Sequence, residues 1–474
     1  MQRACVIGSG PNGLAAAIVL AQAGLRVEVY ESETEPGGAA RTLPLTLPGF
    51  LHDFGSAVFP FAAGSPFFTT LPLANYGLEW VHGEAPLAHP FNDGTAAVLD
   101  RDLGATARRL GPDGVHWRHL VEPAAAHWKD FAEDALAPAL RIPHHPLLMA
   151  RFAMSGLESA QFLARDRFAG LRTRAVFAGL AAHSLMSLDQ PLTAAIGTLF
   201  AASLHAPGWP VPRGGARSIT HALLGYLESL GGKLIASHRV ESEEFRQLVS
   251  EGALMMCDVT PRQLLALAGD QLTVGHRLAL ANFRHGPGAF KIDYALSEPV
   301  PWRSPDCRRA ITVHLGGTLE EIAASEHAAV HGREPERPFV LVAQPSLFDP
   351  ARAPRGKHVL WAYCHVPNGS TFDMTERIEA QIERFAPGFR DCVLARHISS
   401  PALLESMDAN LVGGDIAGGA ITLRQFFLRP TLRAYGTSHP NIYLCSASTP
   451  PGGGVHGMCG YHAAKMALRR MHGQ

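Results

Sequence analysis

Three glycines near the start of the chain have the spacing of a phosphate-binding loop. Gly8, Gly10 and Gly13 form the pattern GxGxxG. In such a loop the first glycine permits a tight turn, the second lets backbone approach a pyrophosphate, and the third lets a helix pack closely on a strand. Glu31 follows at the end of the next expected strand, where a carboxylate can accept hydrogen bonds from ribose hydroxyls. These residue types predict a dinucleotide site.

The elements that must position this loop are also visible in the sequence. Residues 4–7 are a short apolar run suited to a buried parallel strand, and residues 14–23 have the composition of a helix that Gly24 closes. Residues 27–30 supply a second strand. The free N–H groups and partial positive charge of the helix N-terminus favour phosphate binding. A glycine motif alone is weak, but this βαβ context favours a nucleotide site over a purely structural turn. It does not distinguish FAD from NAD.

A second glycine-rich segment, residues 35–41, follows directly. Its small residues would let backbone pass close to a ligand, and Arg41 could reach a phosphate or the edge of a flavin. An ordinary surface loop with an exposed arginine explains the segment equally well. Taken alone, it leaves both interpretations open.

Two later segments have the same strand-and-helix character. Ile219, Leu223, Leu227 and Leu230 form one apolar face of a helix over 216–230, and a strand is expected over 233–237. Towards the C-terminus, residues 442–445 are typical of a central strand. Two prolines at 450–451 prevent immediate helix formation, three glycines bring backbone close to something bulky, and a long helix is expected to begin near residue 455.

These motifs together resemble FAD-dependent oxidoreductases of the carotenoid (phytoene) desaturase and isomerase type, which share their fold with flavin amine oxidases. The resemblance runs from end to end and is strongest to a branch of uncharacterised desaturase-like proteins. It is carried by the segments already described and by residues 52–56, 208–215, 231–232 and 441–457. It implies bound FAD and hydride transfer to flavin N5.

The resemblance also implies roles for single residues. Val240 would lie against the adenine, and the start of the C-terminal helix would face the pyrimidine end of the flavin, where it stabilises the charge of the reduced ring. Ser446 stands where the family usually has glycine, so its hydroxyl would press on the pyrophosphate or donate to it. The expected cofactor-binding residues are Gly8, Gly10, Pro11, Asn12, Gly13, Glu31, Gly38, Ala39, Arg41, Gly55, Ser56, Val240, Ser446, Ala447, Gly454, Val455 and His456.

The expected fold class is α/β, with a discontinuous Rossmann-like FAD-binding domain and a mixed α+β substrate domain. The chain is too long for one hydrophobic core. Residues 290–296 alternate apolar and polar, which predicts a half-buried strand in a mixed sheet with strands over 310–315, 339–342 and 359–366. Helices over 119–204 would cover that sheet. The FAD domain is assigned residues 1–70, 205–265 and 405–474, and the substrate domain 71–204 and 266–404.

The chemistry expected in the second domain needs an apolar cavity more than a catalytic triad, and no triad, metal site or nucleophile stands out. His456 and His183 are weak catalytic candidates, and a structural role is favoured for each. Tyr461 could supply half of an aromatic cage. The leading hypothesis is a dehydrogenase or desaturase of a lipophilic or polycyclic molecule. The alternatives are an amine oxidase, which would want a lysine near N5, a reduced-flavin isomerase, and a non-catalytic FAD-bound scaffold.

Bulk properties narrow the partners and the compartment. The net charge of -1 does not indicate the excess of basic residues that nucleic-acid binding needs. The seven cysteines form no CxxC pair, so neither a disulfide framework nor zinc is expected, and a reducing, cytoplasmic setting follows. A signal peptide over the first 25 residues is rejected because cleavage would remove the glycine motif. The apolar stretch 176–209 is too interrupted to span a bilayer. It is interpreted as buried helices lining a substrate cavity, with peripheral membrane contact as the alternative. No pattern specifies an oligomeric state.

Overall fold

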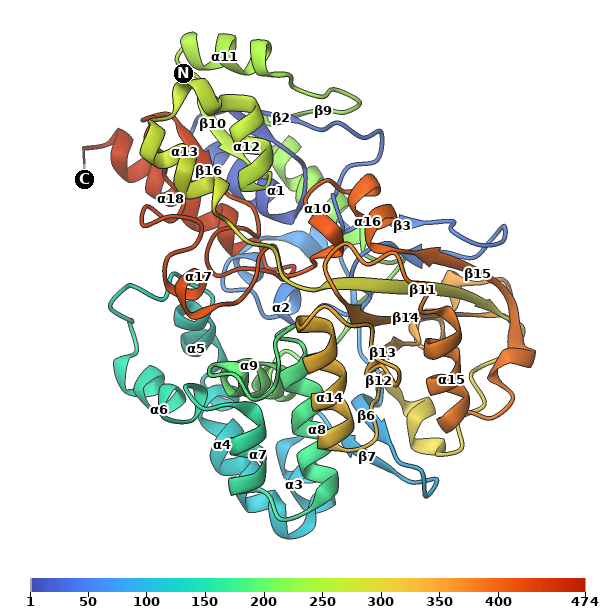
Figure 1. Ribbon diagram of the computed structural model, residues 1–474. Coiled ribbons are helices and arrows are strands. Elements are labelled where there is room, and N and C mark those ends of the chain that lie inside the picture. Colours follow the sequence, from blue (N-terminus) through green and yellow to red (C-terminus); the bar gives the residue numbers. More distant parts are fainter. Residues whose placement is uncertain (1, 474) are drawn as a thin grey trace.

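The computed structural model describes residues 2–473 and contains a parallel sheet whose middle strand leads into the glycine loop (Figure 1). Its strand order is β16-β10-β1-β2-β9, and every neighbouring pair is parallel. These strands come from distant parts of the chain: β1 (Arg3–Ile7), β2 (Arg26–Tyr30), β9 (Lys233–Ile235), β10 (Leu254–Cys257) and β16 (Ile442–Leu444). The α/β class and the Rossmann-like arrangement are therefore confirmed.

Helices cover both faces of this sheet, which explains why its strands are apolar throughout. On one face α1 (Pro11–Gln22) packs against α10 (Arg217–Ser229) and α18 (Met458–Met471). On the other lie α11 (Ser242–Ser250), α12 (Pro261–Ala268) and α13 (Val274–Ala281). Helix α1 begins at Pro11, whose missing N–H costs nothing at a first helical position.

The second sheet has the strand order β15-β11-β14-β13-β12-β6-β7. All neighbours are antiparallel except β12 and β6, so the expected mixed sheet is confirmed. Its strands are β6 (Ala85–Pro90), β7 (Ala96–Leu99), β11 (Gly288–Leu296), β12 (Ala310–Leu315), β13 (Val340–Ala343), β14 (His358–Val366) and β15 (Val393–Ser399). Helix α15 (Thr375–Phe385) covers one face.

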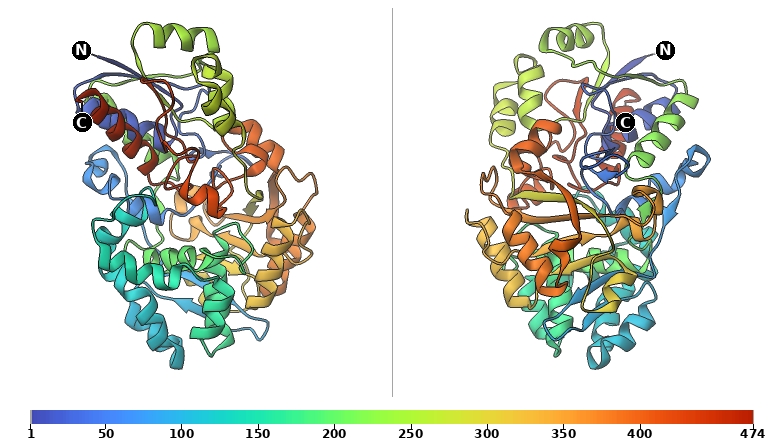
Figure 2. Two further views of the ribbon diagram at one scale, coloured as in Figure 1. Left: turned by 60° about the vertical axis from the view of Figure 1, so that its left-hand side comes forward. Right: turned by 90° about the vertical axis from the view of Figure 1, so that its right-hand side faces the viewer.

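A layer of helices covers the other face of the seven-stranded sheet, as the sequence predicts. These helices lie at the end of the molecule opposite to α11 and α13 (Figure 2). They are α3 (Leu103–Arg109), α4 (Gly114–Ala126), α5 (Trp128–Ala135), α6 (Pro146–Gly156), α7 (Ala160–Arg167), α8 (Leu171–Ala182), α9 (Thr193–His205) and α14 (Leu319–Val330).

Short elements connect these layers. Two small antiparallel pairs join β3 (Thr42–Leu43) to β4 (His52–Asp53) and β5 (Trp80–Val81) to β8 (Val211–Pro212). The remaining α-helices are α2 (Pro60–Ala63), α16 (Pro401–Met407) and α17 (Leu423–Phe427). Single 3-10 turns span Phe68–Thr70, Leu73–Tyr76, Gly111–Asp113, Gly269–Gln271, Pro305–Arg309, Pro345–Leu347, Pro350–Arg352, Phe389–Cys392 and Val412–Gly414.

Three expectations about single elements are wrong in detail. Strand β16 is at the edge of its sheet rather than central, because β10 is its only strand neighbour among residues 2–473. Strand β11 is buried along its whole length, because its polar Lys291 and Asp293 pair with each other between the layers. Helix α18 begins at Met458, three residues later than expected, since Gly457 before it has φ +69°.

The strands of the two large sheets fall within the segments assigned to the two domains, although the domain boundaries themselves stay a prediction. The apolar stretch 176–209 forms α8 and α9, most of whose residues are buried in the helical layer. No helix in the described part of the chain has the length and apolarity that a membrane crossing needs. All seven cysteines are buried as free thiols.

Candidate active site

A single cavity of about 680 Å³ is lined by both sheets. The glycine loop and the end of β2 line one part of it. Side chains from β11, β12, β13 and β14 line another, together with residues from α9. The expected cofactor segments therefore open into the same space as the face of the seven-stranded sheet.

The glycine loop has the geometry that its three glycines predict. Gly8 has φ +98°, in the region that favours glycine, and its N–H donates to the Tyr30 carbonyl at the end of β2. A Cβ on Gly13 would overlap the Gly8 carbonyl oxygen, so this glycine lets α1 start against the turn. Gly8, Gly10, Pro11 and Asn12 line the cavity, whereas Gly13 lies behind the loop and does not.

The Glu31 carboxylate ties this loop to the end of β2. It is buried, and its Oε2 accepts hydrogen bonds from the Ser9 N–H at 3.0 Å and the Ser9 hydroxyl at 2.6 Å. Ser9 Oγ in turn accepts from the Gly37 N–H at 3.0 Å. These hydrogen bonds fix the shape of the loop. Because Glu31 also lines the cavity, its carboxylate remains accessible to a ligand.

Asp258 is a site residue that sequence reasoning missed. It follows β10, and its Oδ2 accepts from the Gly13 N–H at 2.8 Å, at the N-terminus of α1. A Cβ on Gly10 would lie 2.7 Å from that oxygen, so Gly10 makes room for a carboxyl as well as for a ligand. Burial raises the pKa of Asp258 to about 8, and the nearby Asp408 and Glu31 add to the rise. The sequence feature that could have revealed Asp258 is its position directly after an apolar strand, where residues 258–261 form a loop.

Arg41 lines the cavity but is held by protein groups. Its Nε donates to the Gly38 carbonyl at 2.7 Å and its Nη2 to the Met407 carbonyl at 2.6 Å. Its guanidinium lies 4.9 Å from the centroid of the Phe54 ring. The interpretation as an exposed surface arginine is therefore wrong, because only 6% of the residue is exposed. Gly38, Ala39, Gly55, Ser56 and Val240 also line the cavity.

The C-terminal segment reaches the cavity through residues 451–456. Ala447, Gly454, Val455 and His456 line it. Ser446 does not: its hydroxyl is buried and donates to the Val259 carbonyl at 2.7 Å. The expectation that Ser446 presses on a pyrophosphate, or donates to one, is therefore wrong, because that hydroxyl joins two segments of the protein instead.

His456 is positioned as a neutral hydrogen-bond donor. Its Nδ1 accepts from the Met458 N–H at 3.0 Å, which places the imidazole proton on Nε2. Burial lowers the pKa of His456 to about 4, so the ring is neutral at physiological pH. Within residues 2–473, Nε2 is a buried atom without a partner. A buried N–H of this kind favours a ligand that accepts its hydrogen bond.

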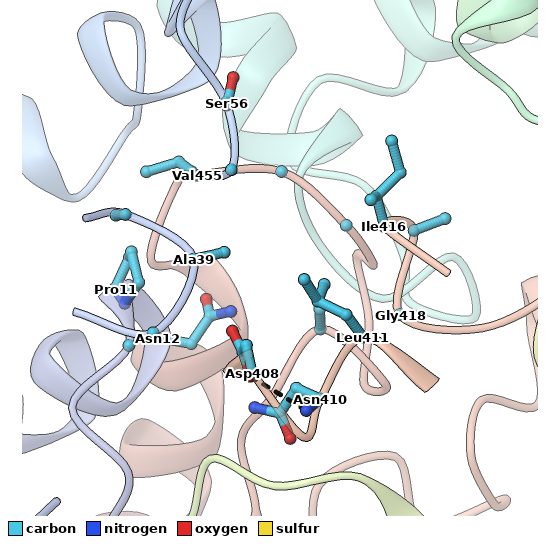
Figure 3. A pocket seen from close by; sticks show the side chains of 18 of the residues that line it. Pro11, Asn12, Ala39, Ser56, Asp408, Asn410, Leu411, Ile416, Gly418 and Val455 are labelled. Atoms are coloured by element: carbon cyan, nitrogen blue, oxygen red, sulfur yellow. Dashed lines mark hydrogen bonds between the residues drawn. The ribbon is translucent and has the colours of Figure 1, made fainter. Parts of the chain in front are cut away.

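A second wall of the cavity comes from residues 404–418, which the sequence did not mark. Figure 3 shows Leu411, Ile416 and Gly418 facing Pro11, Ala39 and Val455 across the pocket. The Asn410 N–H donates to Asp408 Oδ1 at 3.0 Å, which fixes the turn between them. Burial raises the pKa of Asp408. Most of this segment has no regular secondary structure, so no periodic pattern could reveal it.

The other end of the cavity is apolar and aromatic. His183, at the end of α8, stacks on Phe200 with ring centroids 4.2 Å apart. Its Nε2 lies 3.4 Å from Nε2 of His314, and burial lowers the pKa of His183 to about 3. Leucine, isoleucine and aromatic side chains complete this end: Leu185, Ile196, Leu199, Trp209, Leu341, Trp361 and Tyr363.

Lys291 on β11 is the cation at this end and was also missed. It pairs with Asp293 two residues along the same strand. Burial raises the pKa of Asp293 to about 6 and lowers that of Lys291, while each charge favours its partner's charged form. Because Lys291 lines the cavity and Asp293 does not, the pair presents its amine end to a ligand.

Tyr461 does not belong to the site. It lies on α18 and packs on Phe67 with ring centroids 5.0 Å apart, against the core beneath the parallel sheet. It is absent from the cavity lining, so its expected role in an aromatic cage is wrong.

Comparisons with known proteins agree with this geometry. Residues 6–69 match the family described as NAD(P)-binding Rossmann-like domain. The chain is 28% identical to pyridine nucleotide-disulfide oxidoreductase domain-containing protein 2 of Rattus norvegicus, over 98% of this chain and 93% of that protein. It is 23% identical to the lycopene-forming phytoene desaturase of Pantoea ananas, over 99% of each chain. A putrescine oxidase structure superposes with a TM-score of 0.60 at 15% identity, over 100% of both chains.

These likenesses support an oxidoreductase of the flavin amine oxidase superfamily. The rat protein, the phytoene desaturase and the putrescine oxidase each match the chain from end to end, so the likeness covers both sheets and the cavity between them. The glycine loop lies within the matched residues 6–69 and is therefore part of a dinucleotide-binding domain.

Proposed function

We propose that this oxidoreductase uses FAD to dehydrogenate or desaturate a lipophilic or polycyclic small molecule. The observation that carries the proposal is the continuity of the cavity, which is lined by the dinucleotide loop and also by apolar side chains of α9 and the seven-stranded sheet. A flavin bound by the loop and residues 447–456 would present its ring to that apolar end.

The residues present fit FAD. The glycine loop leaves backbone and α1 open to phosphates, and Val240 and Glu31 suit the adenosine end. The unpartnered Nε2–H of His456 suits an oxygen or nitrogen acceptor on the flavin ring. When bound, FAD would supply the hydride acceptor at N5.

The protein's own residues would bind and orient the substrate and keep water away from it. Aromatic and aliphatic side chains exclude water from the apolar end, where Phe200 also holds His183 in place by stacking. Burial lowers the pKa of His183 to about 3, so its ring stays neutral and resists protonation, and it would contact a substrate as a neutral hydrogen-bonding group. The Lys291 amine would donate a hydrogen bond to an electron-rich part of a substrate.

Lys291 also favours a second candidate, an amine oxidase, because that chemistry wants a buried lysine beside the flavin. Two observations count against an amine oxidase. Lys291 is paired with Asp293, and Tyr461 lies outside the cavity. Alkene and polycyclic donors should be compared with primary amines for anaerobic bleaching of the bound flavin. We expect the lipophilic donors to bleach it and the amines to leave it oxidised. Bleaching by amines alone would reverse the ranking.

A further inference from the structure

Apolar side chains gather on the outside of α6, where a soluble surface would be polar. Leu147, Met154 and Leu157 are 87%, 71% and 61% exposed, and their spacing places them on one side of the helix. The opposite side, with Leu148, Met149 and Phe152, packs against the helical layer. A helix that is apolar on both sides is normally covered on both.

The turn before α6 presents two more apolar side chains. Ile142 is 90% exposed and Leu140 is 65% exposed. Asp134 holds this turn, since its carboxylate accepts from the N–H groups of His144 at 2.9 Å and His145 at 2.8 Å. Arg141 donates to the same carboxylate at 2.6 Å. Ile142 therefore projects from a hydrogen-bonded turn.

A second segment adds to this surface from the far end of the sequence. Leu423, Phe427 and Leu432, in and after α17, are 55%, 41% and 83% exposed. Figure 1 shows α17 next to α5, and Ala135 on α5 and Phe426 on α17 line the same cavity. His462 links the two segments, since its Nε2 lies 3.1 Å from the Leu136 carbonyl oxygen and its ring stacks on Tyr435 with centroids 6.1 Å apart.

The charged side chains within both segments are basic, while the carboxylates of Asp130, Glu133 and Asp134 on α5 lie against the turn at His144 and His145. Residues 137–157 and 416–436 contain no aspartate or glutamate. They do contain arginines, of which Arg151, Arg424 and Arg433 are exposed. In the described part of the chain none of these three forms an ion pair, so their charge is available to an anionic surface.

This surface borders the cavity. Leu136, which precedes the turn, lines the cavity, and so do Ile421 and Phe426 on either side of Leu423. An apolar molecule that enters between the two segments would pass from the exposed apolar side chains directly into the cavity.

We propose that the surface formed by residues 140–157 and 423–433 docks in the plane of an anionic lipid bilayer. Exposed leucines and an isoleucine would enter the acyl boundary, while the arginines contact lipid phosphates. The helices α8 and α9, the stretch that the sequence offers for membrane contact, are excluded because they are largely buried. The proposal goes beyond the redox function and depends on neither FAD nor the substrate.

The test is sedimentation of the full-length holoprotein with vesicles of phosphatidylcholine, with and without phosphatidylglycerol. We expect binding to the anionic vesicles that weakens with salt. Ile142→Glu with Leu147→Glu should weaken it by about tenfold or more. The matched control is Val274→Glu, which also replaces an exposed apolar residue in the first turn of a helix but lies on α13, far from the surface.

A second pair of variants keeps the test independent of folding. Ile142→Trp should show a blue-shifted emission with anionic vesicles, and Val274→Trp should show none. Equal binding by the double variant and the parent protein would overturn the proposal. So would absence of vesicle binding combined with self-association that the double variant abolishes, since the surface would then be covered by a second copy of the chain.

Discussion

At the scale of single residues, the site is shaped by buried groups that are held neutral. Asp258 has a pKa of about 8 because it is buried among other carboxyls, so it carries a proton at neutral pH. His456 and His183 are neutral because burial lowers their pKa values to about 4 and about 3. Because these side chains are neutral, they neither repel a negatively charged pyrophosphate nor place a charge beside an apolar substrate in the same cavity.

Asp258 should make dinucleotide binding depend on pH. Above pH 8 its carboxyl loses its proton and places a negative charge beside Gly10 and Gly13, where phosphates would bind. We expect the affinity of the apoprotein for FAD to fall between pH 7 and pH 9.5, and the affinity of Asp258→Asn to stay level. Fluorescence quenching of FAD measures both. If the FAD affinities of the parent protein and of Asp258→Asn fall with pH in the same way, a group other than Asp258 causes the pH dependence.

His456 should tune the flavin through its free Nε2–H. Removing one hydrogen bond to the reduced ring, worth about 1.4 kcal/mol, should lower the two-electron potential by about 30 mV in His456→Ala. Anaerobic redox titration measures this. Tyr461→Phe is the control, because Tyr461 lies outside the cavity. If His456→Ala leaves the potential, the reduction rate and its pH dependence unchanged, the residue is structural.

At the scale of elements, the site depends on how closely α1 starts against the glycine turn. In Gly13→Ala the new methyl would overlap the Gly8 carbonyl oxygen, which forces α1 away from the loop. We expect loss of bound cofactor and a fall of about 1–3 kcal/mol in the free energy of unfolding. Denaturant titration and the flavin-to-protein absorbance ratio measure these changes. Gly275→Ala, whose new methyl meets open space on α13, should lower neither quantity.

The same scale explains what could be predicted from the sequence. The βαβ unit and the α18 region were predictable because spaced glycines and apolar runs are local signals. The sheet positions of β16 and β11 were not, since a three-residue strand does not specify its neighbours and the Lys291–Asp293 pair imitates a solvent-facing pattern. Tertiary contacts place residues 404–418 and Asp258 at the cavity. Such contacts produce no periodic pattern in the sequence, so they could not be predicted from it.

At the scale of the whole molecule, enclosed histidines should set its acid stability. Burial lowers the pKa values of six of them to about 3 or 4: His52, His89, His183, His205, His456 and His462. Their contribution to stability is full above the unfolded pKa of about 6.5 and is lost as pH falls towards the folded values, because the unfolded chain binds the protons first.

The melting temperature should therefore fall steeply between pH 7 and pH 5. The raised pKa values of Asp258 and Asp293 act in the opposite direction but involve fewer groups. Differential scanning calorimetry over this range checks the sign. A melting temperature that rises on acidification would mean that the carboxyls outweigh the histidines.

The central claim is that both ends of the chain build one flavin site facing an apolar cavity. The most direct test is the visible spectrum of the purified protein before and after anaerobic reduction, with the released cofactor identified. The account predicts a two-band flavin spectrum that bleaches and FAD on denaturation. A colourless protein that cannot be reconstituted with FAD would contradict it.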